Sequence, residues 1–78
     1  MPAHELRDAF SQAAGPSVTV TNARMRYAPM NHQILEFDGF VGQEPFHVVE
    51  NSIKPEINPL VHARIMGEAF RQKLAAKS

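Results

Sequence analysis

The stretch HQILEFDGFVGQEPFHVVENSI, residues 32–53, decides the fold. It can form a β-hairpin in either of two registers, and the choice between them determines which residues face the core. The Asp-Gly pair at 38–39 is the stronger local turn signal, but a turn there would leave a proline inside the paired region. A two-residue turn at 42–43 instead sets Phe37 opposite Val48 and keeps one face of the hairpin apolar. Because a buried apolar face is what fixes strand register, we predict the turn at 42–43.

The segment before this hairpin predicts a third strand. Residues 17–27 begin with a run of β-branched side chains, and residues 28–31 predict a turn into the hairpin. Regular pairing would place Met25 and Tyr27 on the face away from the core, whereas a β-bulge near Asn22 would turn both toward it. Either alternative gives an antiparallel meander with more apolar residues than one covered face needs.

Helices flank the predicted sheet in the sequence. Residues 3–14 carry apolar side chains at helical spacing, Pro2 suits the first turn, and a Gly-Pro pair ends the segment. Asn58 is a good N-cap and Pro59 a good first residue for a second helix that runs to about Ala76. Apolar residues cover well over half of this helix, so we expect it to contact two partners rather than one.

These elements predict a single α+β domain over residues 1–78. The predicted order is a helix, a three-stranded antiparallel meander (17–27, 32–41 and 44–53) and a long C-terminal helix. We expect both helices to pack mainly on one face of the sheet. The predicted core draws on both helices and all three strands: Leu6, Phe10, Val18, Val20, Leu35, Phe37, Phe46, Val48, Ile65 and Phe70.

Composition limits the compartment and the class of partner. The 78 residues include no cysteine, which fits a reducing compartment and excludes thiol catalysis and cysteine-ligated zinc. We find no secretory leader and no apolar run of membrane-spanning length, and we therefore expect a cytoplasmic protein without a membrane partner. Eight basic residues balance eight acidic ones, which argues against nucleic acid as the main partner.

Four histidines are the main candidates for chemistry. They are scattered and show no metal-ligand spacing, so we predict no metal site and no cofactor. In the predicted register Asp38 faces His47 across the hairpin, but a catalytic dyad would need a nucleophile that the sequence does not place nearby. His62 falls within the apolar arc of the last helix, as expected for a buried or interface histidine. We therefore predict no catalytic residue and no enzyme.

The order of elements is also that of double-stranded RNA-binding domains, a resemblance of topology alone. Those domains carry a basic cluster at the start of the last helix, where residues 53–60 here contain one base and one acid. Their binding residues therefore do not transfer to this chain. The alternative prediction is nevertheless a nucleic-acid-binding domain that uses the basic C-terminal helix. Its candidate contacts are Arg24, Arg26, Arg64, Arg71 and Lys73.

The favoured function is a non-enzymatic protein-binding module that acts as a regulator, adaptor or inhibitor. This prediction follows from two features: the small domain has more apolar surface than its core needs, and its polar residues form no catalytic or ligand-binding motif. An inhibitor of a host system, encoded by a phage or mobile element, is one such role, although no residue points to it. We expect the partner to be another protein, a second copy in a homodimer, or both. The predicted interface is Met25, Tyr27, Ile34, Val49, Ile53, His62 and Met66.

Overall fold

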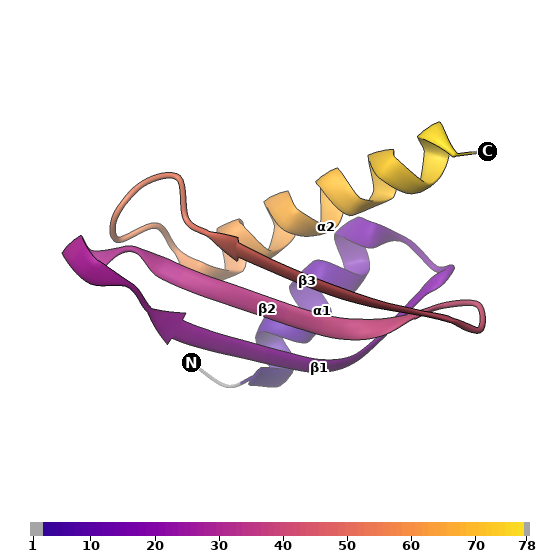
Figure 1. Ribbon diagram of the computed structural model, residues 1–78, viewed down its shortest axis with the longest axis horizontal. Helices are drawn as coiled ribbons and strands as arrows, with labels where there is room; N and C mark the ends of the chain where they lie inside the picture. Colours follow the sequence, from indigo (N-terminus) through magenta and orange to yellow (C-terminus); the bar gives the residue numbers. More distant parts are fainter. Residues whose placement is uncertain (1–2, 78) are drawn as a thin grey trace.

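The computed structural model describes residues 3–77 and confirms the predicted order of elements. Helix α1 spans Ala3–Ala14 and helix α2 spans Pro59–Ala76. The strands form one antiparallel sheet in the order β1-β2-β3, and their bounds are Val18–Tyr27, Gln33–Val41 and Glu44–Asn51. Both helices lie behind the same face of this sheet, as predicted (Figure 1). Pro2, expected in the first turn of α1, lies outside the described residues.

The β2–β3 hairpin has the register that its apolar face predicts. Phe37 pairs with Val48 and Gly39 pairs with Phe46, so the Asp-Gly dipeptide lies inside β2 rather than in the turn. The space around position 39 also requires a glycine. A Cβ there would lie 2.8 Å from the Phe46 ring and closer still to the Thr19 carbonyl oxygen. The burial of one face has therefore outweighed the local turn preference.

Strand β1 contains the β-bulge that the sequence allowed as an alternative. Its pairing with β2 shifts between Val20 and Asn22. The shift turns Ala23 and Met25 toward the helices, where Ala23 is buried and Met25 packs against the core. The prediction of Met25 on the exposed face of the sheet is therefore wrong. Tyr27 follows the same alternation but is 78% exposed at the end of the strand.

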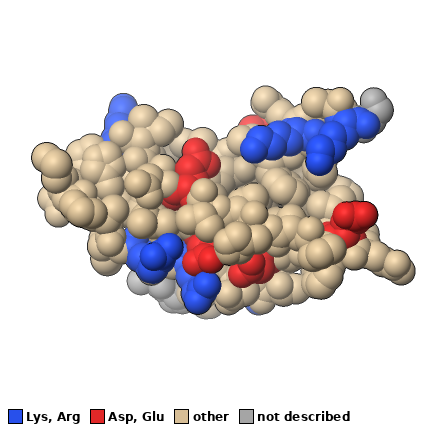
Figure 2. All heavy atoms as spheres, in the orientation of Figure 1, with Lys and Arg blue, Asp and Glu red and all other residues tan. Residues whose placement is uncertain are grey.

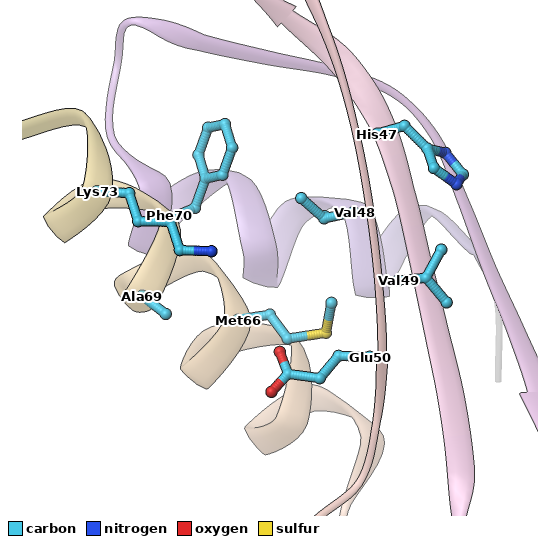
Figure 3. A pocket seen from close by; sticks show the side chains of 8 residues that line it. All are labelled: His47, Val48, Val49, Glu50, Met66, Ala69, Phe70 and Lys73. Atoms are coloured by element: carbon cyan, nitrogen blue, oxygen red, sulfur yellow. The ribbon is translucent and has the colours of Figure 1, made fainter. Parts of the chain in front are cut away.

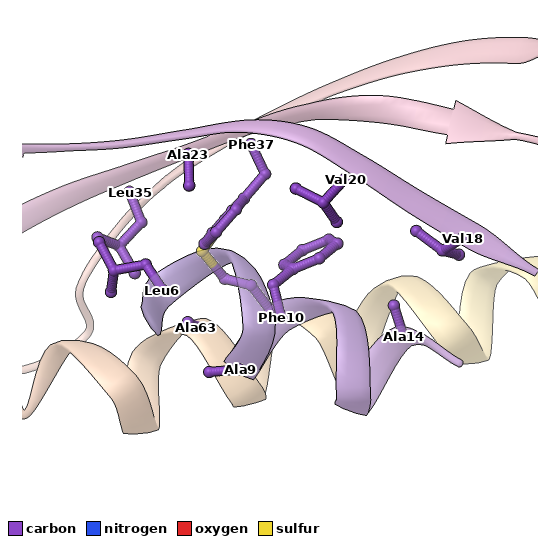
Figure 4. Packing of buried hydrophobic residues seen from close by; sticks show 11 residues of the cluster. Leu6, Ala9, Phe10, Ala14, Val18, Val20, Ala23, Leu35, Phe37 and Ala63 are labelled. Carbon is purple, nitrogen blue, oxygen red and sulfur yellow. The ribbon is translucent and has the colours of Figure 1, made fainter. Parts of the chain in front are cut away.

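An aromatic cluster forms the centre of the core (Figure 4). Phe10 of α1 and Phe37 of β2 are fully buried, with their stacked ring centroids 4.4 Å apart. Phe46 and Phe70 extend the cluster toward α2, at 6.1 and 5.8 Å from Phe10, and are only partly buried. Ile65 was predicted to be core but is 46% exposed, because α2 presents this part of its surface to solvent.

Helix α2 packs closely against α1 through small residues. Ala63 is fully buried, and Gly67, one turn later, is buried against the end of α1. A Cβ on Gly67 would lie 2.9 Å from the Ala13 Cβ and closer still to the Phe10 carbonyl oxygen. This contact fixes α2 beside α1, and from there α2 diverges from β3 toward its C-terminal end (Figure 1).

Helix α2 begins and ends where the sequence predicts. Asn58 accepts a hydrogen bond from the Leu60 backbone N–H at 2.8 Å, and Pro59 is the first helical residue. The last turn closes with a bond from the Lys77 N–H to the Leu74 carbonyl at 3.2 Å. Within residues 3–77, neither α1 nor α2 combines the length and the hydropathy that crossing a bilayer requires.

Candidate functional site

Two adjoining hollows separate β3 from α2, and together they form what we call the β3–α2 cleft. The first hollow encloses about 260 Å³, and its lining includes Val48, Glu50, Met66 and Ala69 (Figure 3). The second encloses about 360 Å³ toward the β2–β3 turn, and its lining includes Val41, Phe46, Leu74 and Lys77. Phe70 and Lys73 line both hollows, which makes the cleft continuous.

The floor of the cleft is the uncovered end of the aromatic cluster. The rings of Phe46 and Phe70 lie 4.6 Å apart, and both side chains remain partly exposed. Figure 3 shows Phe70, Val48 and Met66 directed into the space between α2 and β3. An apolar side chain placed on this floor would lose its contact with water, which contributes about 1.5–3 kcal/mol when burial is complete.

Strand β3 presents an unpaired backbone edge beside the cleft. In the two-residue hairpin, even-numbered residues of β3 bond to β2, and the bond from Ser52 N to Gln33 O at 2.7 Å continues this pattern. The odd-numbered residues therefore direct their backbone groups away from the sheet. His47, Val49 and Asn51 each offer an N–H and a C=O there, and no described strand pairs with them. An extended chain could add to this edge as a fourth strand.

Basic side chains border the cleft near the end of α2. Lys73 and Lys77 line it, and neither forms an ion pair with any residue from 3 to 77. Arg71 differs, because its hydrogen bonds with Glu68 raise the pKa of Arg71 and lower that of Glu68. Figure 2 shows basic side chains gathered over the C-terminal half of α2. Cations beside an apolar floor favour a ligand that carries both an apolar and an anionic group.

A buried polar network ties α2 to the sheet. Gln33, Ser52 and His62 are each 4% exposed. The Gln33 side-chain amide donates to His62 Nδ1 at 3.2 Å, and the Gln33 backbone N–H donates to Ser52 Oγ at 3.1 Å. Burial lowers the pKa of His62, partly opposed by the Glu50 charge, and so the ring is neutral near pH 7. His62 thus holds the fold together rather than facing a partner, which corrects its assignment to an interface.

Ser52 and His32 come closest to a nucleophile with its base. Ser52 Oγ lies 3.3 Å from His32 Nδ1, but the same nitrogen lies 2.9 Å from the Ser52 carbonyl oxygen. A nitrogen that donates its proton to a carbonyl cannot also accept the proton of a hydroxyl. His32 therefore does not activate Ser52, and the pair is a structural contact. Among residues 3–77 no three side chains are grouped so as to hold a metal ion.

The open face of the sheet carries a cluster of hydrogen-bonded polar side chains. Asp38 and His47 face each other as predicted, with Oδ1 and Nδ1 2.5 Å apart, and this hydrogen bond lowers the pKa of Asp38. Glu36 lies between Arg24, at 3.1 Å, and His47, at 3.3 Å. These polar groups satisfy one another at the centre of the face. The open face is therefore less suited than the cleft to an apolar partner.

The predicted interface residues do not form one surface. Val49 and Met66 border the cleft, although Met66 is itself buried, and Ile34 lies half-buried on the open face. Tyr27 and Ile53 lie elsewhere, at the end of the sheet that carries the β1–β2 turn. The wide apolar arc of α2 indicated in the sequence that this helix has a second apolar contact. The sequence pattern did not predict that Phe46 and Lys77 line the cleft.

A second exposed apolar group, which we call the apolar tip, consists of Tyr27, Met30 and Ile53. These side chains are 78%, 86% and 80% exposed, more than any other large apolar residue in the described chain. A backbone bond from Glu56 N to Asn31 O at 2.9 Å ties together the two loops that carry the tip. Met30 adopts a φ of +63°, a left-handed conformation that is unfavourable for a methionine.

The basic residues of the nucleic-acid alternative are also dispersed. They belong to β1 (Arg24, Arg26) and to α2 (Arg64, Arg71, Lys73), and Arg24 and Arg71 are engaged in ion pairs. Figure 2 shows acidic side chains between the basic group over β1 and the one over α2. No family model, curated protein or solved structure matches the chain. The candidate site therefore rests on its own geometry.

Proposed function

We propose that this chain is a small, non-enzymatic, cytoplasmic protein-binding module that docks a segment of another protein in the β3–α2 cleft. In this role it acts as a regulator, adaptor or inhibitor of that partner. The observation that carries the proposal is the unpaired edge of β3 directly beside an apolar floor. One such surface supplies backbone hydrogen bonds and apolar contacts to the same extended segment.

The summed contact energies are of the same order as the cost of association. Each backbone hydrogen bond contributes about 0.5–1.5 kcal/mol net, and each buried aliphatic side chain about 1.5–3 kcal/mol. His47, Val49 and Asn51 provide the backbone groups, and Phe46 and Phe70 provide the apolar contact. A few such contacts together offset an association cost of about 4–15 kcal/mol. The net free energy that these ranges leave is modest, so the cleft alone supports weak, reversible binding rather than picomolar affinity.

Two alanines of α2 provide a matched test. Ala69 and Ala75 are both exposed, but only Ala69 lines the cleft. A photo-reactive residue at position 69 should cross-link the partner and so allow it to be purified. The affinity of the purified partner is then measured for the parent protein and for two variants, Ala69→Arg and Ala75→Arg. Ala69→Arg should weaken binding at least tenfold by filling the cleft, whereas Ala75→Arg should bind like the parent. Equal affinity of Ala69→Arg and the parent, with unchanged melting curves, would refute docking at this site.

Self-association is a second proposal, which involves exposed apolar residues of β3 and α2. A homodimer would cover side chains such as Val49 and Ile65, which are each 46% exposed. Sedimentation equilibrium over a hundredfold concentration range should show a reversible monomer–dimer transition. A strict monomer at the highest concentration would eliminate the dimer and leave the cleft for a different protein.

A further inference from the structure

We infer that the docked segment is an extended chain with apolar residues at alternate positions, followed on its C-terminal side by carboxylates. The inference rests on the proposed function and specifies the chemistry of the partner. It follows from two features of the cleft: the direction of the β3 edge and the uneven distribution of charge along the lining.

The alternation follows from strand geometry. Side chains of an added strand point in turn toward the helices and toward the open face of the sheet. Those on the helix side would enter the cleft, whose first hollow is lined by Val48, Met66 and Phe70. Those on the other side would extend the open face beside His47, which is polar and solvent-exposed. Only every second residue of the partner therefore needs to be apolar.

The order of the motif follows from charge and direction. Strand β3 runs from Glu44, at the hairpin turn, to Asn51. Because antiparallel pairing is the more stable arrangement per residue, the docked segment runs the opposite way. Its C-terminal end then reaches the second hollow, where Lys73 and Lys77 face one acid, Glu44. Its N-terminal end passes Glu50 in the first hollow, whose one lysine, Lys73, is shared with the second hollow. Carboxylates are thus favoured at the C-terminal end of the segment and disfavoured at its N-terminal end.

Synthetic peptides test this order directly. The first peptide has valine at alternate positions followed by two glutamates, the second has glutamines in place of the glutamates, and the third has the glutamates first. The first should bind about tenfold more tightly than the second or the third; tenfold corresponds to about 1.4 kcal/mol, which two exposed ion pairs can supply. This preference should weaken as salt is raised.

Charge reversal in the protein provides the converse test. The double variant Lys73→Glu with Lys77→Glu should lose the preference for the first peptide and gain one for a peptide that ends in lysines. Arg64→Glu, an exposed α2 residue that lines neither hollow, should leave the preference unchanged.

The outcomes separate this inference from the proposed function. Equal binding of the glutamate and glutamine peptides, still blocked by Ala69→Arg, would overturn the charge order and leave docking in the cleft standing. Failure of all three peptides to bind at millimolar concentration would overturn the inference, and the cross-linked partner would then decide the proposed function independently.

Discussion

Replacing Gly67 with alanine tests whether the contact between α1 and α2 outweighs helix propensity. Alanine is the better helix former by about 1 kcal/mol, so propensity alone predicts a more stable protein. The structure predicts the opposite. The new Cβ would lie 2.9 Å from the Ala13 Cβ, 3.2 Å from the Ala14 backbone nitrogen and closer still to the Phe10 carbonyl oxygen. All three atoms are held by α1, so the two helices must move apart.

The loss from the clash exceeds the gain from propensity. Inserting a carbon into a packed interior typically costs about 1–3 kcal/mol, and here the upper end applies because the contacted atoms belong to the backbone or sit next to it. After subtraction of about 1 kcal/mol for propensity, we expect Gly67→Ala to destabilise the protein by about 2 kcal/mol. In a domain of this size the melting temperature should fall by about 10 °C.

Chemical and thermal denaturation followed by circular dichroism measure this change. Ala69→Gly, in the same helix but on its exposed surface, is the control for propensity and should cost about 1 kcal/mol. A Gly67→Ala protein that is as stable as the parent, or more stable, would refute the reasoning. It would mean that α2 is not held against α1 at this position.

Four further predictions address the core, the titration of a buried histidine, the apolar tip and the nucleic-acid alternative. Phe37→Ala should cost about 3–5 kcal/mol in equilibrium unfolding, because Phe37 is fully buried against Phe10; a melting temperature close to that of the parent would contradict it. Burial holds the pKa of His62 below its usual 6.5, so the unfolded chain takes up a proton that the folded chain resists, and stability should fall as the pH drops through about 6.5. His62→Asn keeps an acceptor for the Gln33 amide and should flatten that part of the stability profile; an unchanged slope would contradict this assignment. Met30→Gly should raise stability by up to about 1 kcal/mol, since glycine adopts a φ of +63° without strain; a loss of stability would show that the exposed methionine supports the turn. Random duplex DNA or RNA should bind weakly at physiological salt, and a submicromolar dissociation constant there would promote the nucleic-acid alternative.

The elements and the register of the hairpin followed from local patterns in the sequence. Alternating apolar residues at 33–41 and 44–51 specify which residues pair, because a shift by one residue would expose the whole buried face. Asn58 and Pro59 mark the start of α2 through hydrogen bonding and φ preference that need no tertiary contact. These signals depend only on spacing along one element or on neighbouring residues, and so they can be read directly.

The direction in which each apolar face points depended on tertiary structure. The bulge between Val20 and Asn22 turns Met25 against the core, although a regular strand would expose it. Ile65 is exposed, because the position of α2 is set by the fit of Gly67 against α1 rather than by the apolar periodicity of the helix. The same placement leaves the β3–α2 cleft open. Periodicity shows that a helix has a wide apolar arc, but only the rigid packing of helix on helix determines which part of that arc remains uncovered.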